Sequence, residues 1–373
     1  MSHPRLTELR LAPGRRIVCV SDIHGHLGHF DRLMEKIRFT TDDFLIVIGD
    51  AVECGPEPLG ALRRVMALEK SGCAQMLAGN WEARLHKLLI SDEPEDSALL
   101  LRMSLFWQRN GGGSLLTGMC AEIGVSLDEN SDMRAILPRV RKAFADEIAY
   151  MGSLPIILDA GDFVCVHGGL NTLDRAALMA ERDDYGFLKN DRFAEQGHAF
   201  ERWVITGHWP VANYDREISR YSPHIFPDKR IAAIDGGCGK HLEAQLNALI
   251  MRAGRPGEFE WDFVDDFPRA RALEAQAASE SPIHTVWDTR FVDVLEKGPE
   301  FARVRHQATG RILEVPLNRL WLNNGVEVID SFTDYMLPVK PGDALSIILE
   351  TSRGLYCKKG SVAGWYAGRY EKE

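Results

Sequence analysis

Short apolar runs that end abruptly in polar residues and glycine recur along the first two thirds of the chain. The first is RRIVCVSDIHG at residues 15–25, and the pattern returns at 43–50, 74–82, 162–169, 202–210 and 230–237. Runs of this length, rich in isoleucine and valine, are typical of buried strands. The segments HFDRLMEKIRF and PLGALRRVMALEKSG, which separate the first three runs, carry apolar residues at helical spacing. The pattern therefore predicts strand–helix–strand units in an α/β domain.

Residues 83–150 depart from this alternation. Segments such as EARLHKLLI and EDSALLLRMSLFWQR favour helices, and the sequence NGGG at 110–113 interrupts them. We expect a helical insertion here, placed after the third strand and overhanging the strand ends. Farther along, EAQLNALIM at 243–251 is predicted to form the last strand of this domain.

The pattern changes again after residue 252. Residues 253–283 lose the hydrophobic period and gain charge, proline and alanine, which is typical of a connector. Residues 284–373 consist of short β-type runs separated by turns, as in a small all-β barrel. We therefore expect a domain at 1–252 with a helical insertion at about 83–150, a connector at 253–283 and a small all-β domain at 284–373.

Composition and charge exclude several classes of function. The 373 residues carry a formal net charge of −10, which argues against a general nucleic-acid-binding surface. No stretch approaches the roughly 18 apolar residues of a membrane span, and residues 1–16 lack the apolar core of a signal peptide. The seven cysteines are scattered singly, as in reduced cytoplasmic proteins. We expect a cytoplasmic protein with no membrane partner and no zinc bound through cysteine.

Polar side chains follow the predicted strands at the point where each strand ends. Because the carboxyl ends of strands in α/β sheets meet at one crevice, these side chains should converge. An Asp-x-His sequence also places two side chains on the same side of an extended backbone. Carboxylates mixed with imidazoles suit manganese, iron or zinc better than calcium. The six candidate ligands are Asp22, His24, Asp50, Asn80, His167 and His208.

Each of these motifs is weak alone, because a single histidine at a strand end is more often a hydrogen-bonded structural residue. Six ligand-type residues at five consecutive strand ends, with glycines beside them, form a much stronger pattern. A single carboxylate can bridge two ions about 3.5–4 Å apart, and Asp50 is the candidate. The set predicts two divalent transition-metal ions, manganese first, with iron or zinc as alternatives.

The blocks SDIHG, GDAVECG, GNWE, VHGGL, TGHWPV and IDGGCG follow one another over residues 21–239. Their order resembles the phosphoprotein phosphatase branch of the calcineurin-like metallophosphoesterases. The segment FWQRNGGGSLLTGM at 106–119 also resembles bacterial members, including relatives that cleave diadenosine tetraphosphate. The resemblance implies a two-sheet sandwich flanked by helices, and a water that bridges two metals and attacks phosphorus. It assigns one metal to Asp22, His24 and Asp50, and the other to Asp50, Asn80, His167 and His208.

The sequence departs from the family pattern beside these ligands. The second family block usually reads Gly-Asp-x-x-Asp-Arg-Gly and the third Gly-Asn-His-Glu. Here Glu53, Cys54 and Trp81 stand in place of that Asp, Arg and His. In the family the His protonates the leaving oxygen, the Asp orients the His, and the Arg grips phosphate. An indole cannot release a proton near neutral pH, and loss of the Arg removes a bidentate phosphate contact.

Three interpretations follow from these replacements. In the first, the protein hydrolyses aryl esters or anhydrides, whose leaving groups need no proton. In the second, another residue supplies the proton, either Glu53 or His26, although His26 also fits a plain loop position. In the third, the site binds metal and phosphate with little turnover, as a sensor or scaffold. Trp81 is then either core filling or a platform on which an aromatic group stacks.

We therefore expect slow or altered metal-dependent hydrolysis of a phosphoprotein, a nucleotide or a small phosphoester. Asp50, Glu53, Trp81 and His26 are the candidate catalytic residues. Arg182 lies where the family carries a further phosphate-binding Arg, and a solvated helix arginine is an equal alternative.

The alternative function is a weakly catalytic binding module whose C-terminal β domain docks a protein partner. That domain loosely resembles Src-homology-type barrels, which bind peptides. Some of its aromatic residues are expected in a groove and most in its core: Trp287, Phe291, Trp321, Trp365, Tyr366 and Tyr370.

Overall fold

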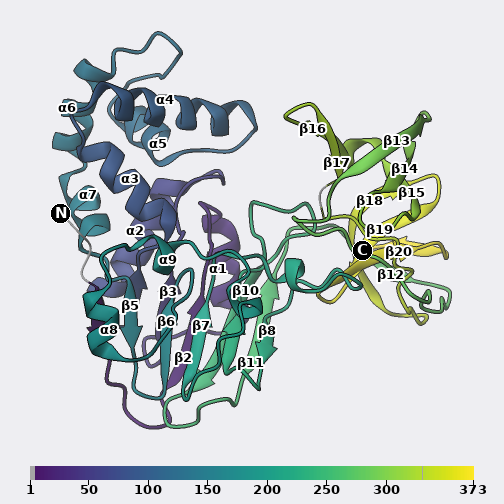
Figure 1. The fold of residues 1–373 in the computed structure, drawn as a ribbon, viewed down its shortest axis with the longest axis horizontal. Helices are drawn as coiled ribbons and strands as arrows, with labels where there is room; N and C mark the ends of the chain where they lie inside the picture. Colours follow the sequence, from purple (N-terminus) through teal and green to yellow (C-terminus); the bar gives the residue numbers. More distant parts are fainter. Residues whose placement is uncertain (1–4, 330) are drawn as a thin grey trace. The chain divides into compact units, whose positions relative to one another are not determined.

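The chain forms two compact units in a computed structural model that describes residues 5–329 and 331–373. The first unit comprises Met1–Trp209, Pro223–Lys240 and Leu246–Val264, and the second comprises Pro210–Ser222, His241–Gln245 and Asp265–Glu373. Figure 1 labels the helices and strands of both. Within the described residues, no helix combines the length and the apolar character that a membrane span requires.

The first unit contains a five-stranded sheet that carries three of the predicted strand ends. Its order is β11-β10-β2-β3-β4, and β2, β3 and β4 are parallel to one another. Every residue of β3 is buried, as expected for a strand covered on both faces. The bounds are β2 Arg16–Val20, β3 Phe44–Ile48, β4 Ala74–Leu77, β10 Leu246–Arg252 and β11 Glu260–Val264.

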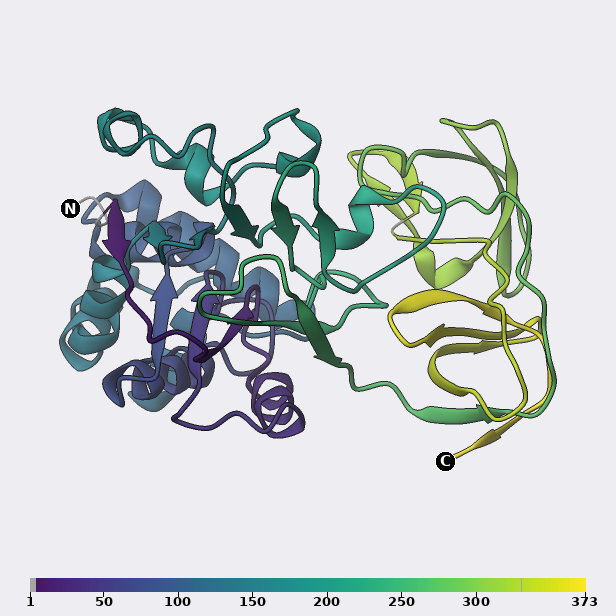
Figure 2. The same cartoon turned by 90° about the horizontal axis from the view of Figure 1, so that it is seen from below.

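A six-stranded sheet forms the second layer of this unit. Its order is β1-β5-β6-β7-β9-β8, with β6, β7 and β9 parallel to one another. Figure 2 shows the two sheets as two layers. Buried apolar residues of both sheets, among them Ile46 of β3 and Cys165 of β6, form one core between the layers. The bounds are β1 Leu6–Glu8, β5 Ile157–Asp159, β6 Phe163–Val166, β7 Trp203–Thr206, β8 His224–Phe226 and β9 Ile231–Ala233. The predicted two-sheet α/β sandwich is confirmed.

Helices flank the sheets and fill the predicted insertion. Helices α1 and α2 join the parallel strands, and each turns an apolar face inward, for example Phe30 and Leu33 of α1. The insertion expected at about 83–150 is helical, and Figure 1 shows it at the top of the view. The bounds are α1 Leu27–Lys36, α2 Pro58–Lys70, α3 Asn80–Ile90, α4 Pro94–Arg109, α5 Leu115–Glu122, α6 Met133–Ala143, α7 Ala145–Ser153, α8 Arg175–Ala180 and α9 Tyr185–Leu188, with short 3₁₀ turns at Phe193–Glu195, Val211–Tyr214 and Leu317–Arg319.

The labelled strands of the second unit, within the described residues, pair antiparallel with one another, which confirms the small all-β C-terminal region. Its sheets have the orders β20-β19-β18-β12-β21, β13-β14-β15 and β16-β17. Trp365 and Tyr366 are buried in its core, whereas Trp287 and Trp321 are exposed. The bounds are β12 Arg269–Ala272, β13 Val292–Lys297, β14 Phe301–His306, β15 Ile312–Pro316, β16 Leu320–Asn323, β17 Val326–Ile329, β18 Ala344–Thr351, β19 Gly354–Lys359, β20 Val362–Tyr366 and β21 Tyr370–Lys372.

The strand predicted at 243–251 is not the last one of its sheet. It corresponds to β10, and β11 pairs antiparallel with it on the side away from β2. Charged and turn-forming residues around 253–259 conceal this short hairpin from a search for hydrophobic period. Residues 253–283 thus contain β11 and β12, and the predicted domain boundaries at 252 and 284 stay a prediction.

Candidate metal centre

The loops that follow β2 and β3 lie side by side and carry the first three candidate ligands. The backbone nitrogen of Asp22 donates to the Gly49 carbonyl at 3.1 Å, and that of His24 donates to the Asp50 carbonyl at 2.9 Å. Asp22, His24 and Asp50 all have a left-handed backbone, with φ of 54°, 47° and 51°. Such a conformation costs non-glycine residues on the order of 1–3 kcal/mol each, and it persists only where surrounding contacts hold it. These three candidate ligands are therefore held by the contacts around them in a conformation that costs energy.

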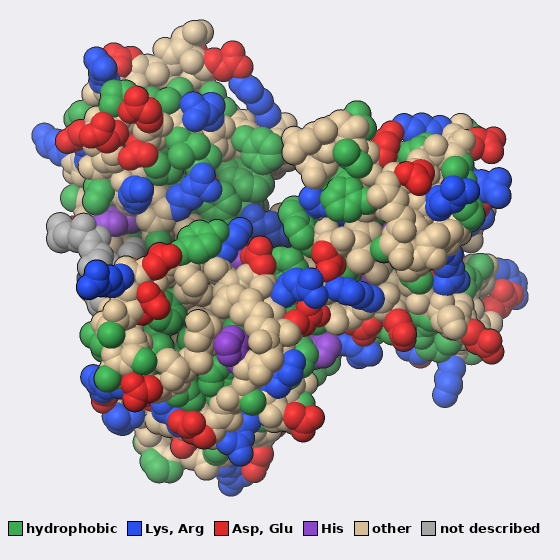
Figure 3. Space-filling view, viewed as in Figure 1, with side chains coloured by type: hydrophobic (Ala, Val, Ile, Leu, Met, Phe, Trp, Pro, Cys, Tyr) green, Lys and Arg blue, Asp and Glu red, His purple; other side chains and the backbone are tan. Residues whose placement is uncertain are grey.

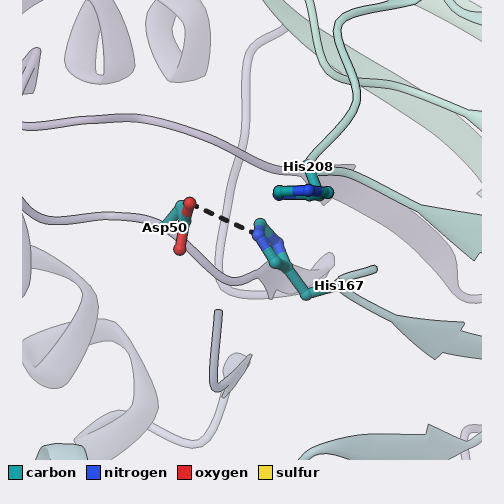
Figure 4. Close-up of side chains that lie close together, drawn as sticks. All are labelled: Asp50, His167 and His208. Carbon is teal, nitrogen blue, oxygen red and sulfur yellow. Dashed lines mark ion pairs between the residues drawn. The ribbon is translucent and has the colours of Figure 1, made fainter. Parts of the chain in front are cut away.

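Two groups of side chains share the carboxylate of Asp50. In one group, ligand atoms of Asp22, His24 and Asp50 lie within 4.8 Å of one another, and in the other those of Asp50, His167 and His208 do so. Figure 4 shows the second group, with His167 pointing toward Asp50 and His208 above it. The distance between Asp50 Oδ2 and His167 Nε2 is 3.3 Å. The structure thus brings five of the six predicted ligands together around one carboxylate.

Asn80, the sixth candidate, lies beside the same group as the first residue of α3. Its Oδ1 is 3.3 Å from His167 Nε2. The parallel strands β3 and β4 place Asn80 next to Asp50, because their carboxyl ends are in register. All six candidate residues therefore lie close together, and their role as metal ligands stays a prediction.

Hydrogen bonds orient two of the imidazoles for metal binding. The Nδ1 of His167 lies 2.7 Å from the Ile48 carbonyl, and the Nδ1 of His24 lies 3.3 Å from the Val52 carbonyl. A proton on each Nδ1 donates to these carbonyls and leaves Nε2 as a lone-pair donor facing the carboxylates. Backbone contacts of this kind commonly fix the tautomer of metal-binding histidines.

His208 is held from both sides by carboxylates. Its backbone nitrogen donates to Asp22 Oδ2 at 3.0 Å, and its Nε2 lies 2.8 Å from Asp191 Oδ1. If Nε2 carries the proton and donates it to Asp191 Oδ1, Nδ1 is the ring nitrogen that can bind a metal ion. Asp191 was missed in the sequence because it lies in the loop after α9, away from every strand end.

Glu82 is the second residue that sequence reasoning missed. Its buried carboxylate accepts hydrogen bonds from the backbone nitrogens of Asp50 at 2.8 Å, Ala51 at 2.8 Å and Gly79 at 2.9 Å. It therefore ties the loop after β3 to the start of α3. The available signal was its place three residues after Gly79, as in a capping box.

Two glycines permit this close packing. A Cβ on Gly79 would lie 2.2 Å from Asp50 Oδ1, and a Cβ on Gly207 would lie 2.5 Å from Asp22 Oδ2. Both distances are far inside van der Waals contact, so neither position accepts a larger residue without displacing a carboxylate.

The electrostatics of these side chains fit divalent cations. Burial raises the pKa of Asp22 to about 7. Burial lowers the pKa of His208, so its imidazole is neutral, as a ligand must be. For His167, burial lowers the pKa, but the Asp50 and Asp22 carboxylates outweigh it and raise the pKa to about 10. Buried carboxylates need a positive partner, and divalent ions held by these side chains would supply it.

The three positions that depart from the family pattern lie together beside the ligands. The backbone nitrogen of Trp81 donates to Asp50 Oδ1 at 2.9 Å, and its ring is half-buried against Trp107 of α4. Cys54 Sγ lies 3.7 Å from His24 Nδ1. Glu53 is buried, and its Oε1 accepts from the Leu115 nitrogen at the start of α5, while Oε2 has no hydrogen-bond partner among the described residues.

The remaining candidates differ in how near they are to this cluster. His26 is half-buried at the start of α1, and Gly239 and the His24 side chain lie beside it. Arg182 is exposed between α8 and α9, and within the described residues its guanidinium makes no hydrogen bond or ion pair with the six ligands. The role of Arg182 in binding substrate stays a prediction.

The calcineurin-like phosphoesterase family model matches residues 15–243. The chain belongs to the calcineurin-like phosphoesterase family. All six candidate ligands lie inside the matched range, and the two groups around Asp50 supply the carboxylates and imidazoles that divalent metal binding requires.

One curated relative matches the chain over a short segment. A symmetrical bis(5'-nucleosyl)-tetraphosphatase from Mannheimia succiniciproducens is 42% identical over 67 residues, which are 18% of this chain and 24% of the relative. The chain thus matches only about a quarter of that relative's length.

Several solved structures resemble the chain at low identity. A putative diadenosine tetraphosphatase has 18% identity, a TM-score of 0.45, and coverage of 70% of this chain and 99% of its own. A protein serine/threonine phosphatase from Saccharomyces cerevisiae has 16% identity, a TM-score of 0.44, and coverage of 71% and 84%. A cold-active protein-tyrosine phosphatase of a psychrophilic Shewanella species has 17% identity, a TM-score of 0.41, and coverage of 70% and 83%.

Proposed function

We propose that this protein hydrolyses phosphate esters or anhydrides at a centre of two divalent transition-metal ions. The observation that supports this most strongly is that Asp50 belongs to both groups of ligand atoms. Asp22 and His24 complete one group, and His167 and His208 complete the other, with Asn80 as a further ligand beside His167. Manganese is our first choice, and iron and zinc suit the same mixture of oxygen and nitrogen ligands.

Bound divalent ions would supply positive charge for the phosphoryl oxygens and lower the pKa of the attacking water. The chain itself contributes the positions of its ligands. The Trp81 nitrogen holds Asp50 Oδ1, the Ile48 carbonyl holds the His167 ring, and the His208 nitrogen holds Asp22 Oδ2. These contacts come from the backbone, so the ligand geometry is preorganised by the fold.

The proposal includes slow or altered chemistry at the leaving group. Trp81 offers no proton there, and a general acid typically contributes about 10²–10⁴-fold to the rate. Burial raises the pKa of Glu53 to about 8, so its carboxyl holds a proton at neutral pH. Its Oε1, however, is turned to the start of α5. We therefore favour substrates whose leaving groups depart without a proton, and keep Glu53 and His26 as candidate acids.

The substrate class follows from the same features. Aryl phosphates and phosphoanhydrides have stable leaving groups, and dinucleoside polyphosphates are anhydrides. The local likeness to a symmetrical bis(5'-nucleosyl)-tetraphosphatase supports the nucleotide option, while phosphoproteins and small phosphoesters stay in the proposal. A cytoplasmic location is part of the same proposal.

The experiment is a substrate panel with metal-loaded protein. Purified protein is loaded with Mn²⁺ and tested against an aryl phosphate, a bis-aryl phosphate, a phosphoserine peptide and a dinucleoside polyphosphate. We expect turnover of the aryl phosphate or the anhydride, and much slower turnover of the peptide. The Asp22→Asn and His167→Ala variants serve as inactive controls. If the loaded protein turned over none of these substrates, the proposal would fail.

A binding role for the second unit is the alternative function. Trp287 and Trp321 are exposed, and the Arg290 guanidinium lies 3.5 Å from the centre of the Trp287 ring and 5.6 Å from that of Trp321. Exposed aromatic residues beside arginine are common in protein-binding surfaces. If the first unit is inert and tight phosphopeptide binding is lost in Trp287→Ala, this alternative gains.

A further inference from the structure

Lys240 lies beside the metal centre. Its Nζ is 2.9 Å from Cys54 Sγ, and Cys54 Sγ is in turn 3.7 Å from Nδ1 of the ligand His24. Among the residues that the structure describes, no ion pair joins Lys240 to an acidic side chain.

Two indole rings fix the position of this ammonium. Nζ lies 5.2 Å from the centre of the Trp81 ring and 4.9 Å from that of Trp107, within the range of cation–π contacts. Such contacts hold a cation in place and leave its hydrogen-bond donors unused. Figure 3 shows hydrophobic side chains gathered at the surface near α4 and α5.

The backbone that carries Lys240 is also fixed against the ligand loop. Its nitrogen donates to the Gly237 carbonyl at 2.8 Å in a tight turn. At Gly239, where φ is +72°, a Cβ would lie 3.0 Å from His26 Nε2 and 3.5 Å from His24 Cβ. The turn is thus packed closely on the residues that follow β2, which places the lysine at the edge of the centre.

We propose that Lys240 is a substrate-binding residue that donates charge-assisted hydrogen bonds to an oxygen of the substrate's phosphate group. This inference rests on the proposed function and deepens it, because it names the contact for the anionic end of the substrate. An ammonium whose neighbours are one cysteine sulfur and two indole faces still has N–H donors to offer, and a phosphate oxygen is the acceptor that suits them. The charge also favours a phosphomonoester dianion or a polyphosphate over a singly charged phosphodiester.

The inference is tested by phosphate binding, which needs no turnover. Lys240→Met keeps an apolar stem over the indole rings and removes the charge, whereas Lys240→Arg restores it. Lys87→Met, on the exposed side of α3, is the matched control. All four proteins are loaded with Mn²⁺, their metal content is measured, and the affinity for inorganic phosphate is determined by calorimetry.

We expect equal metal content in the four proteins. The Lys240→Met variant should bind phosphate about 10- to 100-fold more weakly, the scale of a lost charge-assisted hydrogen bond, with Lys240→Arg and Lys87→Met near the wild type. On aryl substrates, Lys240→Met should lower kcat/KM for the monoester more than for the bis-aryl phosphate. Unchanged phosphate affinity in Lys240→Met, an equal loss in Lys240→Arg, or a loss explained by missing metal would each overturn the inference.

The two proposals fail in different ways. If the wild type turns over no phosphate ester but binds phosphate, the proposed hydrolysis fails, and the comparison of the four affinities still decides the role of Lys240. If the wild type turns over substrate and Lys240→Met matches it in phosphate affinity, hydrolysis stands and Lys240 is not the contact.

Discussion

The carboxylate of Glu82 accepts a hydrogen bond of 2.8 Å from the backbone nitrogen of Asp50, although the two residues are 32 positions apart. The same carboxylate accepts hydrogen bonds from the backbone nitrogens of Ala51 and Gly79, so it joins the loop after β3, which contains Asp50, to the loop after β4. The position of the shared ligand therefore depends on a residue that would not itself contact a metal ion.

Replacing Glu82 by glutamine should destabilise the protein. A carboxamide has only one acceptor oxygen. Its NH₂ group would therefore face a backbone N–H that now donates to the second carboxylate oxygen, and two donors would be left opposite each other. We expect the free energy of unfolding to fall by about 2 kcal/mol or more, because buried hydrogen bonds to a charged group are among the stronger ones. Denaturant unfolding measures this, with the exposed Glu93→Gln as control. If the two variants were equally stable, Glu82 would not stabilise the loops around Asp50.

The rate should depend steeply on the leaving group. The indole at position 81 cannot protonate an alkoxide leaving group, while a nitrophenolate leaves without help. Turnover measured on a series of aryl and alkyl phosphates should fall as the pKa of the leaving group rises. A flat dependence would mean that another group, such as Glu53 or His26, supplies the proton.

Restoring the family residues should recover activity on alkyl phosphates. The variant with Trp81→His, Glu53→Asp and Cys54→Arg regains an acid, its orienting carboxylate and a phosphate contact, and a gain of about 10²-fold is the scale of general-acid catalysis. The new guanidinium would lie beside the Lys240 ammonium, which is 2.9 Å from Cys54 Sγ. We therefore expect the larger gain when Lys240→Met is added. A quadruple variant that binds metal and remains inert would contradict the account of the missing acid.

Glu53 should make stability depend on pH. Burial raises its pKa from the ordinary 4.5 to about 8, so between these values the folded state keeps a proton that the unfolded state has released. The free energy of unfolding therefore decreases as the pH rises from about 4.5 to about 8, by up to about 1.4 kcal/mol per pH unit. In metal-free protein, the free energy of unfolding of the wild type should fall relative to Glu53→Gln from about pH 5 to about pH 8. A constant difference would show that the carboxyl is not protonated.

Limited proteolysis tests the predicted division of the chain. The first cuts should fall within 253–283, where exposed residues between β12 and Ser281 lie outside regular structure. Residues 284–373 should then resist further cleavage while β12 stays paired with β18 and β21 in the nicked protein. Preferred cutting inside 290–360 with the connector intact would place the boundary elsewhere.

The strands and the positions of the candidate ligands could be predicted because they follow local rules. Residues 44–48 are an unbroken apolar run, so a buried strand was expected there, and Asp50 had to lie at its carboxyl end. Parallel pairing of β2 with β3 and of β3 with β4 then brings Asp22, Asp50 and Asn80 to one edge. No knowledge of distant contacts is needed for this step.

The supporting contacts could not be predicted, because they join residues far apart in the chain. Lys240 meets Cys54 across 186 positions, and nothing in the sequence around Lys240 shows that its turn packs against the loop after β2. Asp191 reaches His208 from a loop without regular period. The short hairpin of β10 and β11 was missed because its turn interrupts the hydrophobic pattern.

The metal content of the wild type and of Asp50→Asn tests the central claim most directly. Both proteins are loaded with Mn²⁺ under the same conditions, freed of loosely bound metal and measured by elemental analysis, with circular dichroism to confirm folding. If Asp50 bridges two ions, the wild type should hold close to two per chain and the folded variant far fewer, because both ions lose a ligand at once. Full occupancy in folded Asp50→Asn, or a wild type that binds no metal, would contradict the account.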